Sequence, residues 1–167
     1  MGSYASDRRK LILNWLPAAC AVAMIAGEST STMSAANTSR WLYPFWVHFF
    51  GPLSAERWHN IHHLIRKTGH FIGYGCVSLC FFYSWSRTLA SAWRNPLAIR
   101  FRSGVLATLC TLIVASADEF HQSFLPSRTS SPYDVGIDVS GAILMQVLLL
   151  IGLTLFARNR QMKAVAV

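Results

Sequence analysis

Charged and hydrogen-bonding side chains cluster at the ends of apolar segments in this chain, and this pattern limits the folds open to it. Four segments are strongly apolar: Leu11–Gly27, Gly69–Trp85, Gly104–Ala117 and Ile137–Ala157. A charge in hydrocarbon costs at least about 2.5–3.5 kcal/mol, so polar groups beside such segments normally face a protein interior or a polar cavity. Three segment ends with complementary charges therefore predict one shared polar site.

The composition indicates an integral membrane protein. Of the 167 residues, 53% are hydrophobic and 13% are charged, whereas soluble domains carry about 25% charged residues. A helix needs about 20 residues to cross the hydrocarbon core, so the short second and third segments must include their polar ends. We expect one all-α domain over residues 1–167, an antiparallel bundle of four transmembrane helices at about 11–27, 67–86, 103–120 and 136–157.

Basic residues predict the orientation of this bundle. Lys and Arg number three before the first helix, four between the second and third, and three after the fourth, which leaves five of the fifteen elsewhere. Because basic residues concentrate on the cytoplasmic side, we expect both termini in the cytoplasm and the polar site at the outer face of a bacterial inner membrane. The net charge of +8 follows from these clusters, so no nucleic-acid partner is expected.

The first outer loop has two parts. Glu28–Ser39 is rich in Ser, Thr and Ala and has the composition of a flexible linker. Arg40–Pro52 is crowded with aromatic residues, which favour the membrane interface. This segment is expected either to lie on the outer leaflet or to cover the helix bundle. Ser54 stands where an N-cap would begin a helix that continues into the second membrane segment.

The polar residues at three segment ends are spaced as on the face of a helix. Residues four apart lie on one face, so Arg66, His70 and Tyr74 form a stripe on the second helix. The same spacing recurs on the third and fourth helices. The resulting candidate site comprises Arg66, Lys67, His70, Tyr74, Asp118, Glu119, Gln122, Arg128, Asp134 and Asp138.

These motifs resemble the VanZ-like family, which is named after a small membrane protein associated with teicoplanin resistance. The matching stretches are RKTGHFIGYGCVSL at 66–79, DEFHQSFLPSR at 118–128, and the block formed by Asp134, Asp138 and Gly141. Asp138 stands where the family usually has Asn, which adds a potential negative charge. The resemblance, over residues 64–157, implies a membrane protein that acts on the cell envelope and lowers susceptibility to a lipoglycopeptide such as teicoplanin.

Three interpretations of the polar cluster stay open. One is a binding site for an anionic membrane lipid or lipid-linked cell-wall precursor, for which the candidates are Arg66, Lys67, Gln122, Arg128, Asp134 and Asp138. Another is a membrane hydrolase or transferase, with acid–base or orienting roles for Asp118, Glu119, His70 and Tyr74. The third is an assembly protein in which the charges only hold the helices together.

Within the site, we expect one of the adjacent carboxylates Asp118 and Glu119 to pair with Arg66, Lys67 or Arg128. The loop residue Arg128 is placed to reach back to a carboxylate. Gly141 is expected to let a neighbouring helix approach closely.

Motifs for other chemistries are weak or missing. His59, His62 and His63 form an H-x-x-H-H run, but no local carboxylate or cysteine completes a metal site, so neither metal nor cofactor is expected. The sequence has no Ser nucleophile elbow, Gly-rich phosphate loop or C-x-x-C motif. A transporter is disfavoured because the polar residues gather at one membrane face. The sequence gives no indication of the oligomeric state.

Overall fold

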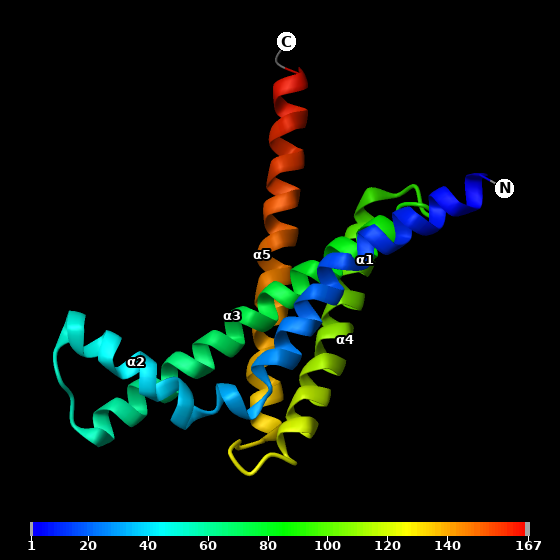
Figure 1. Cartoon of the computed structure of the whole chain (residues 1–167). Helices are drawn as coiled ribbons and strands as arrows, with labels where there is room; N and C mark the ends of the chain where they lie inside the picture. The colour runs from blue at the N-terminus through cyan, green and yellow to red at the C-terminus, as the bar shows by residue number, and fades with distance from the viewer. Residues whose placement is uncertain (1, 166–167) are drawn as a thin grey trace.

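The computed structural model, which describes residues 2–165, is made of α-helices and one 3-10 turn (Figure 1). The elements are α1 (Gly2–Glu28), η1 (Ser31–Met33), α2 (Ala35–Phe50), α3 (Ala55–Leu89), α4 (Pro96–Gln122) and α5 (Pro132–Val165). No strand occurs in this part of the chain, so the predicted all-α class is confirmed.

Each expected membrane segment lies inside a long helix. Three helical stretches are long and apolar enough to cross a membrane: Arg9–Glu28, Pro96–Gln122 and Pro132–Arg160. The segment expected at 67–86 belongs to α3 and is not among them. Its polar residues include Tyr74, Ser78 and Ser84, which are all 0% exposed because they face the other helices.

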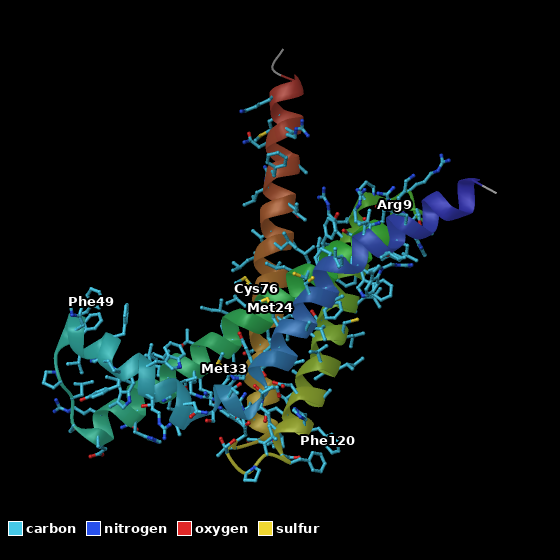
Figure 2. All side chains as sticks on the ribbon, in the orientation of Figure 1. Arg9, Met24, Met33, Phe49, Cys76 and Phe120 are labelled. Carbon is cyan, nitrogen blue, oxygen red and sulfur yellow. The ribbon has the colours of Figure 1, made fainter. Side chains whose placement is uncertain are left out.

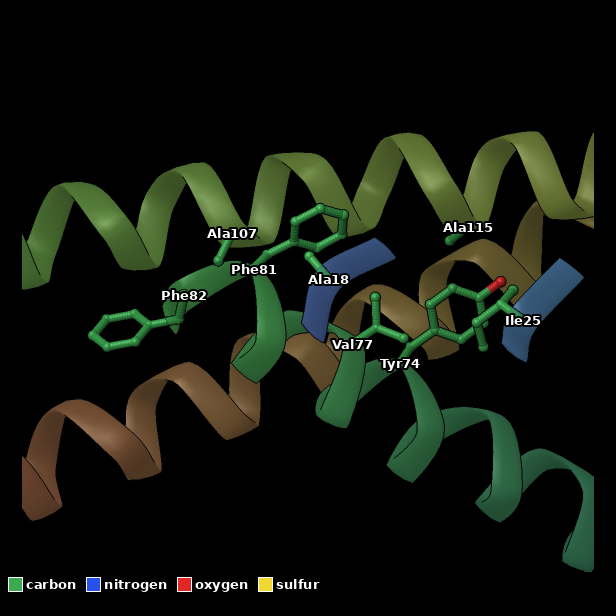
Figure 3. Packing of buried hydrophobic residues seen from close by; sticks show 8 residues of the cluster. All are labelled: Ala18, Ile25, Tyr74, Val77, Phe81, Phe82, Ala107 and Ala115. Carbon is green, nitrogen blue, oxygen red and sulfur yellow. The ribbon is translucent and has the colours of Figure 1, made fainter. Parts of the chain in front are cut away.

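Helix α3 lies at the centre of the bundle and packs against α1, α4 and α5. Aromatic and aliphatic residues of α3 meet small residues of its neighbours, which allow the helices to approach closely. Figure 3 shows this core, formed by Ala18, Ile25, Tyr74, Val77, Phe81, Phe82, Ala107 and Ala115.

Two glycines allow the tight contact between α3 and α5. A Cβ atom at Gly141 would overlap the backbone carbonyl of Phe71. A Cβ atom at Gly75 would lie 2.6 Å from Cγ of Met145. The structure therefore confirms the expectation that Gly141 permits close approach of a neighbouring helix.

The first outer loop is more regular than its composition suggested. The stretch expected to be a flexible linker forms η1 and the first turn of α2, where the Ser34 side chain accepts a hydrogen bond from the backbone N–H of Asn37. Ser54 caps α3 as predicted, by accepting from the N–H of Arg57, and α3 then continues without interruption to Leu89.

Helix α2 projects to the side of the bundle and contacts η1 and α3 (Figure 1). The rings of Tyr43 and Trp46 lie against Trp58, in the first turns of α3. None of its residues is buried, and Figure 2 shows Phe49 at the end of α2 farthest from the bundle. The aromatic segment thus contacts the start of α3, and none of its own residues is buried.

The ends of the helices form two groups (Figure 1). The N-terminal end of α1, the C-terminal end of α5 and the α3–α4 connection lie toward one end of the molecule. The α4–α5 connection and η1 lie toward the other end. This arrangement brings the polar ends of α4 and α5 beside the polar stripe of α3.

Candidate functional site

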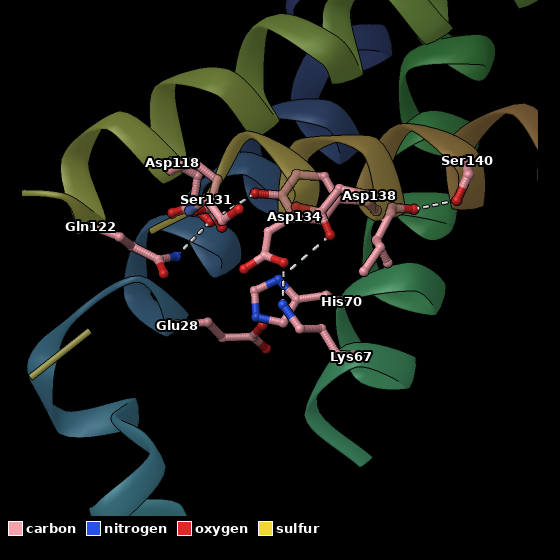
Figure 4. Close-up of polar contacts among 12 residues, drawn as sticks. Glu28, Lys67, His70, Asp118, Gln122, Ser131, Asp134, Asp138 and Ser140 are labelled. Carbon is pink, nitrogen blue, oxygen red and sulfur yellow. Dashed lines mark hydrogen bonds and ion pairs between the residues drawn. The ribbon is translucent and has the colours of Figure 1, made fainter. Parts of the chain in front are cut away.

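The polar stripe in the middle of α3 and the polar ends of α4 and α5 converge on a small pocket beside the α4–α5 connection (Figure 4). Its volume is about 50 Å³, which is enough for a few water molecules. The pocket is lined by His63, Arg66, Lys67, His70, Glu119, Gln122, Thr129, Asp134, Ile137 and Asp138. Seven of these ten residues belong to the candidate site predicted from the sequence.

Two contacts in this pocket join α3 to α5. The ammonium group of Lys67 forms an ion pair with Asp134, and both side chains are partly exposed. Nδ1 of His70 lies 3.6 Å from Oδ1 of Asp138, which is too long for a hydrogen bond. Asp138 is only 1% exposed, and neither of its carboxylate oxygens has a hydrogen-bond partner among the described residues. A buried carboxylate without a hydrogen-bond partner is uncommon. Asp138 also lines the pocket.

Asp118 lies behind the pocket in a buried network. The Tyr74 hydroxyl and Nε2 of Gln122 each donate to Oδ2 of Asp118 at 2.9 Å. Tyr74 is 0% exposed and comes from α3, whereas the other two residues come from α4. The network thus joins α3 to α4, and Tyr74 orients a carboxylate, one of the roles that the sequence suggested for it.

Glu119 connects the end of α4 to the start of α5. Its side chain accepts a hydrogen bond from the backbone N–H of Ser131 at 3.0 Å, and its backbone carbonyl accepts one from the Ser130 hydroxyl at 2.7 Å. Asp118 and Glu119 therefore have different partners, as expected. The expected ion pair of one of them with Arg66, Lys67 or Arg128 is wrong, because Lys67 pairs with Asp134 instead.

Arg66 and Arg128 bind backbone carbonyls. Arg66 donates to the Met33 carbonyl at 2.9 Å and to the Thr38 hydroxyl at 3.4 Å. Arg128 donates to the same Met33 carbonyl at 2.8 Å and also to the carbonyl of Glu28. The prediction that Arg128 reaches a carboxylate is therefore wrong. The role of Met33 could not be recognised from the sequence, because its backbone carbonyl accepts these hydrogen bonds.

The two guanidinium groups share the Met33 carbonyl and form no direct ion pair with any described residue. Burial lowers the pKa of both Arg66 and Arg128, and the charge of Arg128 lowers the pKa of Arg66 further. In the opposite direction, the pKa of Arg128 is raised by the charges of Asp118, Glu119 and Glu28. Both stay charged, because the ordinary pKa of arginine is above about 12. Nε of Arg128 is buried and has no hydrogen-bond partner among the described residues. Neither arginine forms an ion pair with a carboxylate in the described part of the chain.

A second cavity, of about 390 Å³, lies between α2 and α3. Its charged and polar lining residues include Glu28, Arg66, His70 and Arg128, and its less polar lining residues include Trp41, Leu42, Ile65, Gly69 and Gly73. Arg66 and His70 also line the first pocket, so the two cavities adjoin at these residues.

One member of the histidine run, His62, contributes to the contact between α2 and α3. Nε2 of His62 lies 3.1 Å from the Thr38 hydroxyl, and its ring stacks on Trp58. Burial, followed by the charge of Arg66, lowers the pKa of His62. Over residues 2–165, no group of three or more His, Cys, Asp or Glu side chains is arranged to hold a metal ion.

Comparison with known proteins gives one finding. A family model described as VanZ/LLP1 matches residues 11–156. No curated protein matches the chain, and neither does any solved structure. The matched range contains all ten candidate site residues, and it also extends over η1, α2 and most of α1.

Proposed function

Because the chain belongs to the VanZ/LLP1 family, we propose that it acts on the bacterial cell envelope by binding an anionic head group at the outer face of the cytoplasmic membrane. The head group belongs to a membrane lipid or a lipid-linked cell-wall precursor. The observation that carries this proposal is the pair of arginines, Arg66 and Arg128, which share one carbonyl and have no carboxylate partner in the described part of the chain.

We propose that α3 crosses the membrane together with α1, α4 and α5. Its polar side chains face the protein, which makes a less apolar helix tolerable in lipid. The basic clusters support a cytoplasmic location for both termini and the α3–α4 connection, which lie toward one end in Figure 1. The opposite end, with the polar site, then faces outside.

The exposed aromatic residues of α2 support its placement on the outer leaflet. Trp41, Phe45, Phe49 and Phe50 are each more than 60% exposed. Aromatic side chains on a lateral helix are stable at the membrane interface, where the ring meets both lipid and water. Helix α2 would then lie at the depth of lipid head groups, beside the arginine pair.

An anionic oxygen group fits the chemistry of the arginine pair. A guanidinium group offers several N–H donors in a fixed plane, which suits the oxygens of phosphate or carboxylate. Arg128 has a buried N–H without an acceptor, and a bound anion would supply one. Glu28 is the acidic residue lining the same cavity, and it makes no ion pair with either arginine.

Native mass spectrometry of the gently purified protein tests this function. The Arg66→Ala, Arg128→Ala variant is compared with an Arg40→Ala, Arg57→Ala control, which removes one basic residue from α2 and one from the first turn of α3. We expect the wild type and the control to retain one class of anionic lipid or precursor that the first variant loses while still folded. Equal retention by all three proteins would overturn the proposal.

By the family resemblance, we further propose that this binding lowers susceptibility to teicoplanin. The test is the minimal inhibitory concentration of teicoplanin for a susceptible host that expresses either wild type or the Arg66→Ala, Arg128→Ala variant. Protection by the wild type alone is expected, with equal amounts of both proteins in the membrane. No protection by the wild type would contradict this part of the proposal.

A membrane enzyme is the second candidate function, and the His70–Asp138 contact favours it. An unsatisfied buried carboxylate beside an imidazole in a polar pocket can transfer a proton to or from a bound head group. Asp138→Asn and Glu119→Gln should each abolish modification of a bound lipid, detected by mass spectrometry, while lipid binding persists. A purely structural cluster predicts lower thermal stability from Glu119→Gln, with no separate activity lost.

A further inference from the structure

We infer that the ligand of the arginine site is a phosphate-bearing amphiphile, one hydrocarbon chain of which lies in the cavity between α2 and α3, along Gly69 and Gly73. This inference rests on the proposed head-group site and adds where the apolar part of the ligand binds. It is carried by three observations: two glycines whose Cβ positions have no neighbours, the apolar residues that line the cavity, and the two arginines that line the same cavity.

Gly69 and Gly73 are four residues apart on α3, and both line this cavity. A glycine inside a helix is destabilising by roughly 1 kcal/mol relative to alanine. Helix packing accounts for Gly75 and Gly141, because a Cβ atom at either position would meet the neighbouring helix. At Gly69 and Gly73, a Cβ atom would have nothing within 4 Å. Missing side chains at these two positions therefore leave a channel on α3 that the described chain does not fill.

The rest of the wall suits a hydrocarbon chain. Trp41 and Leu42 from α2 face Ile65 and the two glycines from α3 across a cavity of about 390 Å³. That volume falls within the range of about 300–1,000 Å³ found for small-ligand pockets. Burial of apolar surface here would contribute about 0.8 kcal/mol per methylene group.

The charges in the wall of the cavity orient the amphiphile. Arg66 and Arg128 supply two positive charges, so the phosphate lies beside them and the chain extends from there along Gly69 and Gly73. His70 lines both cavities, so the phosphate lies next to the small pocket that Asp138 lines. A soluble phosphate compound would leave the apolar wall uncovered, whereas an amphiphile matches both parts.

The experiment is a titration of the full chain in detergent with oleoyl lysophosphatidic acid, followed by native mass spectrometry, with glycerol 3-phosphate as the chain-free probe. Leucine is introduced at Gly69 or Gly73, where its side chain fills the channel. Gly152→Leu on α5 is the matched control, because a Cβ atom there also has nothing within 4 Å. Wild type should bind the lipid much more tightly than glycerol 3-phosphate.

Each leucine in the channel should raise the dissociation constant for the lipid about tenfold, the effect of displacing roughly two methylene groups. The Gly152→Leu control should stay within about twofold of wild type. A second pair of variants controls for misfolding. Trp41→Ala, which removes part of the cavity wall, should weaken lipid binding. Phe49→Ala on the same helix should not weaken it.

The outcomes separate this inference from the proposed function. If the Arg66→Ala, Arg128→Ala variant loses the lipid but Gly69→Leu, Gly73→Leu and Trp41→Ala bind it as wild type does, the chain lies elsewhere and the inference is overturned. If the arginine variant also binds as wild type does, the head-group site itself is wrong. Equal affinity of wild type for the lipid and for glycerol 3-phosphate would overturn the inference as well.

Discussion

Arg66 and Arg128 donate to the same backbone carbonyl, that of Met33, at 2.9 Å and 2.8 Å. One arginine belongs to α3 and the other to the α4–α5 connection, so the turn that follows α1 is bound from two sides. Both guanidinium groups line the cavity between α2 and α3, and neither forms a direct ion pair with a carboxylate in the described part of the chain. A bound anion would pair directly with both.

Asp138→Asn should stabilise the protein. The carboxylate of Asp138 is buried, and neither oxygen has a hydrogen-bond partner among the described residues. A neutral amide of the same shape removes the charge, and burying an unpaired charge costs more than burying a neutral polar group. Thermal unfolding in detergent should give a higher midpoint than wild type. A lower midpoint would mean that the contact with His70 stabilises the fold more than burial of the charge destabilises it.

Gly141→Ala should destabilise the contact between α3 and α5. The new methyl group would overlap the carbonyl of Phe71, and overpacking of this kind costs about 1–3 kcal/mol. Gly152→Ala on the same helix meets no neighbour and should be neutral or stabilising by up to about 1 kcal/mol. The unfolding midpoint should therefore fall in Gly141→Ala and stay unchanged or rise in Gly152→Ala. Equal midpoints would contradict the close crossing at Gly141.

Acidification should weaken the contact between α2 and α3 through His62. Burial and the charge of Arg66 lower the pKa of His62 in the folded protein below its ordinary value of 6.5. The unfolded chain then binds a proton at a pH where the folded protein does not, so stability falls as the pH drops below about 6.5. The thermal unfolding midpoint should fall between pH 7 and pH 5, and this fall should be smaller in His62→Gln than in the wild type. An equal fall of the midpoint in both proteins would contradict this role of His62.

Reporter fusions test whether four helices cross the membrane. With both termini in the cytoplasm, green fluorescent protein attached after Val167 should fluoresce, and alkaline phosphatase at the same position should be inactive. Alkaline phosphatase inserted in the α4–α5 connection, near Pro126, should be active. An active C-terminal phosphatase would contradict the cytoplasmic C-terminus, and with it the proposed topology of four crossing helices that places the arginine pair at the outer face.

Much of this architecture follows from local sequence patterns. Apolar segments and caps such as Ser54 define helices because they depend on neighbours in the chain. The helical spacing of Arg66, His70 and Tyr74 likewise indicated a shared polar face. The family resemblance agrees with the match over residues 11–156.

The partners of these side chains could not be predicted. Whether Arg128 binds a carboxylate or the carbonyl of Met33 depends on where η1 lies in three dimensions, which spacing along the chain does not encode. The channel beside Gly69 and Gly73 was missed for the same reason, because glycine in a sequence marks either a close helix contact or open space. Only the three-dimensional structure distinguishes the open space at Gly69 and Gly73 from the helix contact at Gly141.

Thermal unfolding with and without phosphatidic acid tests the central claim most directly. A ligand present at about 100 times its dissociation constant stabilises the folded state by about 2.7 kcal/mol, so the wild-type midpoint should rise. The Arg66→Ala, Arg128→Ala variant should also fold, but its unfolding midpoint should not rise when phosphatidic acid is added. An equal rise in both proteins would show that the two arginines only hold the fold together, and would contradict the anion site.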